Sequence, residues 1–264
     1  MLRLTSDSRW ICAIRRKPGT GPLLALAALL WFDQPLSARQ APSADAFAQG
    51  MVSAADPRAA EAGAQMLRQG GSATDAALAT LLALTVVEPQ SSGIGGGGFL
   101  VHADERGRVE TFDGRETAPA AASPDWFSVN GQTLGYRQAI PGGISVGVPG
   151  NLALMDMAHR RHGKLKWRAL FAPAIRLASD GFAIKPRLHQ FLTRYKATGA
   201  YSAEARALFY DAAGEPLPVG TVVRNPALAD FLSRLARKGP RAFYRGQNAR
   251  AIAAAVSTDA RRPA

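Results

Sequence analysis

The hydrophobic positions of this chain recur at helical spacing through most of its length, and glycine and proline interrupt the runs. Asp56 followed by Pro57 predicts a helix start, and Gly70-Gly71 predicts its end. Helices flanking a small amount of strand indicate a mixed α/β protein. The sequence predicts helices over residues 57–69, 73–87, 152–162, 167–179, 186–198, 202–209, 226–238 and 247–256.

One predicted helix differs from the others in its pattern. Ser72 with Asp75 three residues later is typical of a capping box at a helix start. The helix that follows, residues 73–87, is apolar nearly all round, so we expect it to be buried between layers. Residues 99–103 and 108–113 then read as two strands around a polar turn, which predicts an antiparallel hairpin.

The first forty residues have a pattern that differs from the rest of the chain. Arg15-Arg16-Lys17 precedes an apolar run over residues 23–32, and Leu36-Ser37-Ala38 resembles a cleavage site. This pattern predicts an export signal and a periplasmic or secreted protein, although an uncleaved membrane anchor fits the same residues. The predicted organisation is a signal peptide at 1–38, a linker at 39–49 and one structured unit at 50–264.

Charge is concentrated at the two ends of the chain. The formal net charge is +12, and residues 231–264 carry eight basic side chains against one acidic side chain. Neither a basic stripe with regularly interleaved aromatic residues nor an RNA-binding signature accompanies these charges, so we expect neither nucleic-acid binding nor a membrane partner after signal cleavage. Cys12, the only cysteine, lies before the apolar run, and the mature chain is therefore expected to have no disulfide.

Three motifs suggest chemistry, and each has a simpler interpretation. Residues 93–98 match G-x-G-x-x-G, but here a helix precedes the glycines and a strand follows, the reverse of a dinucleotide site. Close backbone packing, or amides that face a ligand, is the better interpretation. Residues 143–147 match the nucleophile elbow G-x-S-x-G without its strand-turn-helix context. His159 and His162 lack a third metal ligand, so we expect a solvated helix face and no metal or cofactor.

Arg115 is the strongest candidate for binding a ligand. It follows the second predicted strand in the run Asp113-Gly114-Arg115-Glu116, where neighbouring acids can fix its rotamer. A planar guanidinium at a strand end is well placed to hold a substrate carboxylate through two hydrogen bonds. An ordinary ion pair between Arg115 and Asp113 or Glu116 is the alternative.

These segments together resemble one known family. The run from Met51 to Pro119 is similar to the large subunit of γ-glutamyltranspeptidase, and the resemblance extends over about residues 50–256. Ser72 and Thr74 depart from the family pattern, but they affect only a cap and a packing position. The segments that carry the resemblance, in the family's order, are 61–63, 70–71, 75–77, 88–99, 113–119, 145–150, 172–175, 180–182 and 239–246.

The resemblance implies a fold, a reaction and a role for one residue. The family has an N-terminal-nucleophile hydrolase fold, an αββα sandwich that would be incomplete without the small subunit. Its precursor cleaves itself, and the new N-terminal threonine takes the γ-glutamyl group from glutathione or a related amide. Water, an amino acid or a peptide then accepts the group, and no cofactor is needed. The family's large-subunit arginine, which binds the substrate α-carboxylate, maps onto Arg115.

The nucleophile that the family uses is not found in this sequence. No Thr-Thr dipeptide occurs among the 264 residues, so we expect no catalytic residue here, a truncated large subunit, and no activity for the chain alone. Two alternatives stay open. One is a glutaryl-type (cephalosporin) acylase of the same fold, and the other is a non-catalytic fragment that holds glutamate through Arg115 and the amides of residues 95–98.

Overall fold

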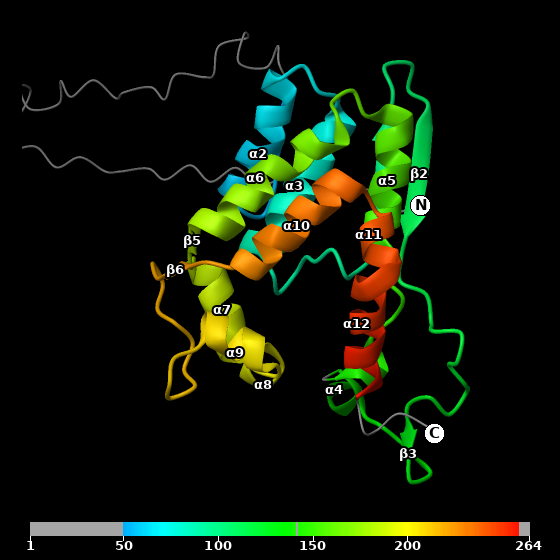
Figure 1. The fold of residues 1–264 in the computed structure, drawn as a ribbon, viewed down its shortest axis with the longest axis vertical. Coiled ribbons are helices and arrows are strands. Elements are labelled where there is room, and N and C mark those ends of the chain that lie inside the picture. Colours follow the sequence, from blue (N-terminus) through cyan, green and yellow to red (C-terminus); the bar gives the residue numbers. More distant parts are fainter. Residues whose placement is uncertain (1–49, 141, 259–264) are drawn as a thin grey trace, which may run out of the picture. The chain divides into compact units, whose positions relative to one another are not determined.

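A computed structural model of the chain describes residues 50–140 and 142–258. The predicted signal peptide at 1–38, the predicted linker at 39–49 and Cys12 all lie outside the described residues, so export stays a prediction. Figure 1 follows the described chain from the helices labelled α2 and α3 to α12. Within this part of the chain, no helix is both long enough and apolar enough to cross a membrane.

The first two helices begin and end close to the predicted positions. In α2 (Pro57–Arg68), the side chain of Asp56 accepts a hydrogen bond from the Arg58 N–H at 2.8 Å. In α3 (Ala73–Val87), Ser72 and Asp75 form the predicted capping box. α3 is buried along nearly its whole length because α2, α5 (Asn151–His162) and α6 (Trp167–Asp180) pack around it. The predicted burial is therefore confirmed.

α6 is also one half of a second helical pair. α10 (Pro226–Lys238) packs on α6, and the two helices run antiparallel. Trp167 Nε1 donates to the Leu235 carbonyl at 3.2 Å near one end, and the Asn225 N–H donates to the Ala178 carbonyl at 2.8 Å at the other. The remaining helices are α4 (Tyr136–Ala139), the 3₁₀ turn η1 (Gly143–Ser145), α7 (Pro186–Arg194), α8 (Lys196–Gly199), α9 (Ala203–Phe209), α11 (Arg241–Tyr244) and α12 (Gly246–Ser257).

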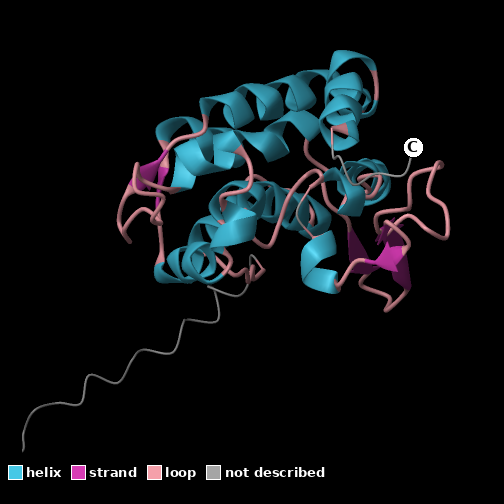
Figure 2. Cartoon of the chain, turned by 90° about the horizontal axis from the view of Figure 1, so that it is seen from below, coloured by secondary structure: helices cyan, strands magenta, loops and turns pink. Residues whose placement is uncertain are grey.

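The strands of the described residues form short antiparallel ribbons. β1 (Gly98–Ala103) pairs with β2 (Val109–Gly114) as the predicted hairpin. One face of this ribbon packs on α5 through Leu100 and Phe112, while Phe99 and Val101 on the other face are exposed. Figure 2 shows how little strand lies among the helices. The other ribbons are β3 (Ser128–Val129) with β4 (Gln132–Thr133) and β5 (Phe182–Ala183) with β6 (Val222–Val223).

Several features of the fold differ from the predicted elements, among them the short helices α4 and α11 and the turn η1, which were not predicted. The helix expected over residues 186–198 is broken at Tyr195, whose φ of −116° and ψ of 36° separate α7 from α8. The ribbons β3–β4 and β5–β6 were not predicted, because strands of two residues leave no alternating pattern to detect.

Candidate functional site

A glycine-rich turn, residues 93–98, connects the end of α3 to β1 and rests on the start of α5. The Gly96 carbonyl accepts hydrogen bonds from the N–H groups of Gly150 and Asn151, both at 3.0 Å. The Asn151 side chain, itself buried, donates from Nδ2 to the Gly93 carbonyl at 2.7 Å. The order helix, glycines, strand is as predicted, so no helix N-terminus follows the glycines to receive a phosphate.

Close approach of three backbone segments explains several of the glycines. A Cβ atom at Gly97 would lie 2.5 Å from Glu116 Oε2 and 2.6 Å from the Gly114 carbonyl oxygen. A Cβ at Gly150 would collide with that same Gly114 carbonyl. Gly95 is different, because a Cβ there would meet no atom within 4 Å. The packing interpretation is therefore confirmed at Gly97, whereas Gly95 borders open space.

A cleft of about 720 Å³ opens beside this turn. Its walls are one side of α3, the glycine-rich turn, β1 and the start of α5, and Arg115 and Glu116 also line it. The same two residues line a second cleft of about 450 Å³, whose other walls include Trp126 and residues 144–147. Arg115 and Glu116 therefore border both clefts.

Arg115 follows β2 directly and is fixed at both its backbone and its side chain. Its N–H donates to Asp113 Oδ1 at 2.8 Å, and its guanidinium forms an ion pair with Glu116. The side chain is 64% exposed, so the guanidinium lies at the mouth of the cleft and not in its interior. The sequence analysis gave an ion pair of Arg115 with Asp113 or Glu116 as an alternative, and the structure contains this ion pair with Glu116 as the partner. The role of Arg115 in binding a substrate stays a prediction.

Ser145 does not have the geometry of a nucleophile. It lies at the end of η1, where its hydroxyl donates to the Ile140 carbonyl at 2.7 Å. Among the described residues, the element before Gly143, the first residue of this turn, is the helix α4 and not a strand. The sequence argument against a nucleophile elbow at residues 143–147 is confirmed.

The expectation of a solvated helix face at His159 and His162 is wrong. Both side chains are partly buried, because this face of α5 packs toward α3 and the β1–β2 ribbon. His159 Nε2 lies 2.8 Å from the Leu165 carbonyl, and His162 Nε2 lies 2.7 Å from Glu110 Oε2. The His162 ring also stacks on His102 with 3.7 Å between ring centres. Among the described residues, no group of three or more potential ligands could hold a metal ion.

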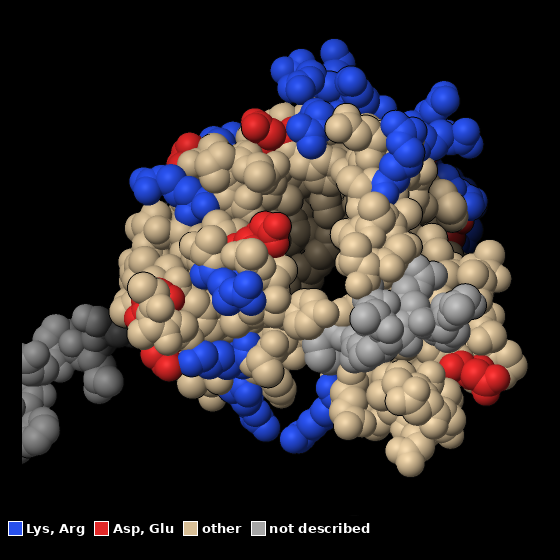
Figure 3. All heavy atoms as spheres, turned by 60° about the horizontal axis from the view of Figure 1, so that its bottom comes forward, with Lys and Arg blue, Asp and Glu red and all other residues tan. Residues whose placement is uncertain are grey.

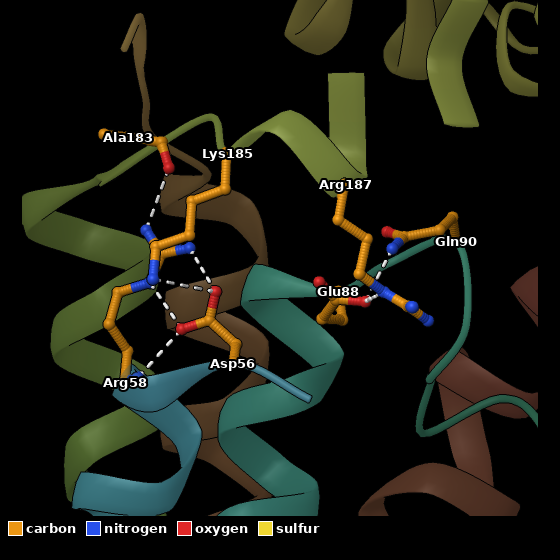
Figure 4. A network of polar contacts seen from close by, with 7 residues as sticks. All are labelled: Asp56, Arg58, Glu88, Gln90, Ala183, Lys185 and Arg187. Atoms are coloured by element: carbon orange, nitrogen blue, oxygen red, sulfur yellow. Dashed lines mark hydrogen bonds and ion pairs between the residues drawn. The ribbon is translucent and has the colours of Figure 1, made fainter. Parts of the chain in front are cut away.

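Two buried carboxylates, shown in Figure 4, connect α2 and α3 to the start of α7 through ion pairs. Asp56 is 1% exposed and pairs with Arg58 and Lys185. Burial opposes its ionisation, but the hydrogen bonds and charge of Arg58, with the charge of Lys185, outweigh burial and lower the pKa of Asp56 below its ordinary value. The network therefore joins the start of α2 to the start of α7.

Glu88, at the end of α3, is tied to the start of α7 in the same way. It is 3% exposed, and its Oε2 accepts hydrogen bonds at 2.7 Å from both Arg187 Nε and Gln90 Nε2 (Figure 4). Because Glu88 is the C-cap of α3, this contact fixes the direction in which the chain leaves toward the glycine-rich turn. Sequence reasoning missed Glu88 and Asn151. The signal was present at Glu88, a charge that ends an otherwise apolar helix.

The sequence of this chain matches a family model and several curated proteins. Residues 59–260 match the family model described as gamma-glutamyltranspeptidase. Over 193 residues the chain is 45% identical to Scoloptoxin SSD14 of Scolopendra dehaani, which covers 72% of this chain and 33% of that protein. It is 42% identical over 198 residues to Glutathione hydrolase 3 of Arabidopsis thaliana, covering 75% of this chain and 30% of that protein. The chain thus spans about a third of the length of the curated relatives it matches.

The fold of this chain also matches that of a solved structure from the same family. The γ-glutamyltranspeptidase of Helicobacter pylori superposes with a TM-score of 0.73 and 32% sequence identity. The superposition covers 77% of this chain and 58% of that chain. The family match over residues 59–260 spans both Arg115 and the glycine-rich turn.

Proposed function

Since the chain belongs to the γ-glutamyltranspeptidase family, we propose that it forms the N-terminal part of the large subunit of an enzyme that moves γ-glutamyl groups. Its fold is accordingly that of a part of an N-terminal-nucleophile hydrolase. The donor is glutathione or a related γ-glutamyl amide, and the acceptor is water, an amino acid or a peptide. The protein is exported through the predicted leader at residues 1–38.

The position of Arg115 is the observation that carries this proposal. The guanidinium lies at the mouth of a cleft of about 720 Å³, on a backbone that Asp113 and the glycine contacts hold in place. A guanidinium has five N–H donors, and Glu116 engages one side of this one. The other side can bind the α-carboxylate of a γ-glutamyl group by donating two parallel hydrogen bonds to it. Glu116 acts as the positioning residue, since its ion pair limits the rotamers of Arg115.

The reacting hydroxyl comes from polypeptide other than these 264 residues. Transfer of an acyl group requires a nucleophile and donors for the oxyanion, and the family's threonine segment is not found in this sequence. The chain alone is therefore expected to be inactive, and its catalytic partner is the small subunit of the same precursor. Arg115 contributes binding and orientation of the donor, not bond making.

An activity assay of the purified chain tests whether the nucleophile comes from another polypeptide. Incubation of the 264-residue chain with a chromogenic γ-glutamyl anilide is expected to release no aniline above the rate of the anilide in buffer. Clear turnover that is lost in Arg115→Ala would contradict the assignment of the nucleophile to another polypeptide. Calorimetry with L-glutamate on the wild type and Arg115→Ala tests the alternative of a glutamate-binding fragment, which requires binding by the wild type that Arg115→Ala abolishes.

A further inference from the structure

Exposed cationic side chains gather at one end of the helical pair α6 and α10. The contact between Trp167 and Leu235 marks this end, because the two helices run antiparallel. The start of α6, the end of α10 and the short helix α11 therefore meet there. We call the group the cationic patch, and its exposed members are Lys164, Lys166, Arg168, Arg234, Arg237, Lys238, Arg241 and Arg245.

The charges of the cationic patch are not neutralised by neighbours. None of its members forms an ion pair with any residue of the described segments. Arg160 and Arg161, just before the patch in sequence, pair with Asp156 and Glu110 instead. The only acidic residue between residues 226 and 258 is Asp230, which lies in the first half of α10, away from the patch. Arg237 and Lys238 complement the dipole at the end of α10, and Arg234 lies over the Phe231 ring, but no carboxylate of the described residues offsets the mutual repulsion of the group.

The chemistry of the surrounding surface narrows the choice of partner. No large apolar side chain is exposed in residues 163–168 or 231–245, whereas stable protein interfaces have an apolar centre. The aromatic rings of the same segments are half-buried at Trp167, Phe231 and Tyr244 and buried at Phe243, so none of them stands fully exposed for a nucleic-acid base to stack on. Long basic side chains project from the upper part of the face drawn in Figure 3. Basic side chains that surround no exposed apolar or aromatic centre can bind a partner surface through its negative charges alone.

We propose that the cationic patch binds the surface of a membrane that contains anionic phospholipids. A group of this size is typical of segments that associate with acidic headgroups, where each cation adds to the affinity. The contact is peripheral, through charge alone, and does not depend on the proposed enzymatic function. It revises the expectation that the mature chain has no membrane partner. The sequence showed the basic excess at residues 231–264, but not that Lys164, Lys166 and Arg168 join it in space.

Vesicle binding of the full 264-residue chain tests the proposal. The probes are vesicles of phosphatidylcholine alone and mixed vesicles of phosphatidylcholine and phosphatidylglycerol, followed by sedimentation. The mixed vesicles are expected to bind more protein, and added salt is expected to release it. Removing three cations in Lys166→Gln, Arg168→Gln, Arg237→Gln should lower the phosphatidylglycerol-dependent partition coefficient about 100-fold, given about fivefold per cation.

A matched variant separates the patch from net charge. Arg106→Gln, Arg194→Gln, Arg224→Gln removes three exposed cations outside the patch and should change the partition coefficient far less. The predicted leader is the same in all three proteins, so any contribution from it is common to them. Equal binding by the two triple variants overturns the proposal, as does equal binding to the two kinds of vesicle. Patch-dependent binding to duplex DNA that is tighter than to the mixed vesicles at the same salt also overturns it, in favour of nucleic acid.

Discussion

A Cβ atom on Gly97 would lie 2.5 Å from Glu116 Oε2, so the glycine-rich turn and the ion-paired neighbour of Arg115 are in direct contact. The side chain that fixes the Arg115 guanidinium is thus itself placed by a backbone position that has no room for a methyl group. The geometry at the mouth of the cleft depends on glycine at this position as much as on the charged residues.

Gly97→Ala is expected to destabilise the protein and to displace Glu116. The new methyl group also meets the Gly114 carbonyl, and backbone cannot move as freely as a side chain. Overpacking of this kind costs about 1–3 kcal/mol of the free energy of unfolding, measurable by chemical denaturation. Gly95→Ala is the matched control, because a Cβ at Gly95 meets open space. Equal losses in the two variants would contradict the packing argument.

Arg187→Ala is expected to leave a buried charge without its main partner. Glu88 is 3% exposed and would keep only the Gln90 amide as a hydrogen-bond donor. The loss should be about 2–4 kcal/mol in the free energy of unfolding. Arg194→Ala, at the exposed end of the same helix, is the control. Adding Glu88→Gln to Arg187→Ala should recover part of the loss, and a double-mutant cycle without coupling would refute the contact.

Acid unfolding should report the ion pairs of Asp56. Its pKa is lowered in the folded protein, so its contribution is fully present above the unfolded-state pKa of about 3.9 and is lost as the pH falls through the folded-state value. Asp56→Asn keeps a side chain that can cap α2 but removes the charge. The variant should lose about 1–3 kcal/mol at pH 7 and show a flatter decline of stability below pH ~4.

The control for Asp56 is an exposed carboxylate with a similar partner. Glu61 pairs with Arg68 on the surface, where both side chains are at least half exposed. Glu61→Gln should therefore change the free energy of unfolding by less than about 1 kcal/mol. If Asp56→Asn keeps the acid sensitivity of the wild type, the network in Figure 4 does not stabilise the fold in the way described.

The sequence predicted the local elements well and the long-range contacts poorly. α3 and the hairpin β1–β2 were found because caps and hydrophobic spacing are local signals. His162 was misjudged because its partners, His102 and Glu110, lie far away along the chain. Nothing in the residues around α5 indicates that a hairpin packs against this face.

In the candidate site, too, the features set by neighbouring residues could be predicted and the contacts between distant residues could not. Arg115 could be found because its neighbours Asp113 and Glu116 are adjacent in sequence and carry the family motif. The glycine-rich turn was recognised as a packing element, but its support could not be, since Asn151 reaches Gly93 from a helix more than fifty residues away. A residue such as Asn151 supports the site only because the fold buries its side chain against the glycine-rich turn. This burial depends on the whole fold and cannot be read from neighbouring residues.

Tyr244→Phe is expected to loosen the contact between α11 and the start of α5. The Tyr244 hydroxyl donates to the Pro149 carbonyl at 2.9 Å and accepts from the Ala153 N–H at 3.1 Å. Losing both should cost about 1–2 kcal/mol of the free energy of unfolding. Tyr201→Phe, at an exposed tyrosine, is the control and should change little.

Alkaline pH provides a second measurement on Tyr244. Burial raises the pKa of its phenol, although the Ala153 N–H acts in the opposite direction. A raised pKa means that the stabilisation is fully present below the unfolded-state value of about 10 and is lost as the pH rises through the folded-state value. Stability of the wild type should therefore fall more steeply than that of Tyr244→Phe above pH ~10. Parallel curves would contradict this role of the hydroxyl.

The most direct test of Arg115 compares two substrates in the complete enzyme, which includes the polypeptide that carries the nucleophile. One is a γ-glutamyl anilide, and the other is a 4-aminobutanoyl anilide, which lacks the α-carboxylate. Arg115→Ala should lower kcat/KM for the γ-glutamyl anilide by at least about 30-fold, the value of a lost charged pair. The same change should leave kcat/KM for the 4-aminobutanoyl anilide nearly unaltered. Equal losses for the two substrates would contradict the assignment of Arg115 to the carboxylate.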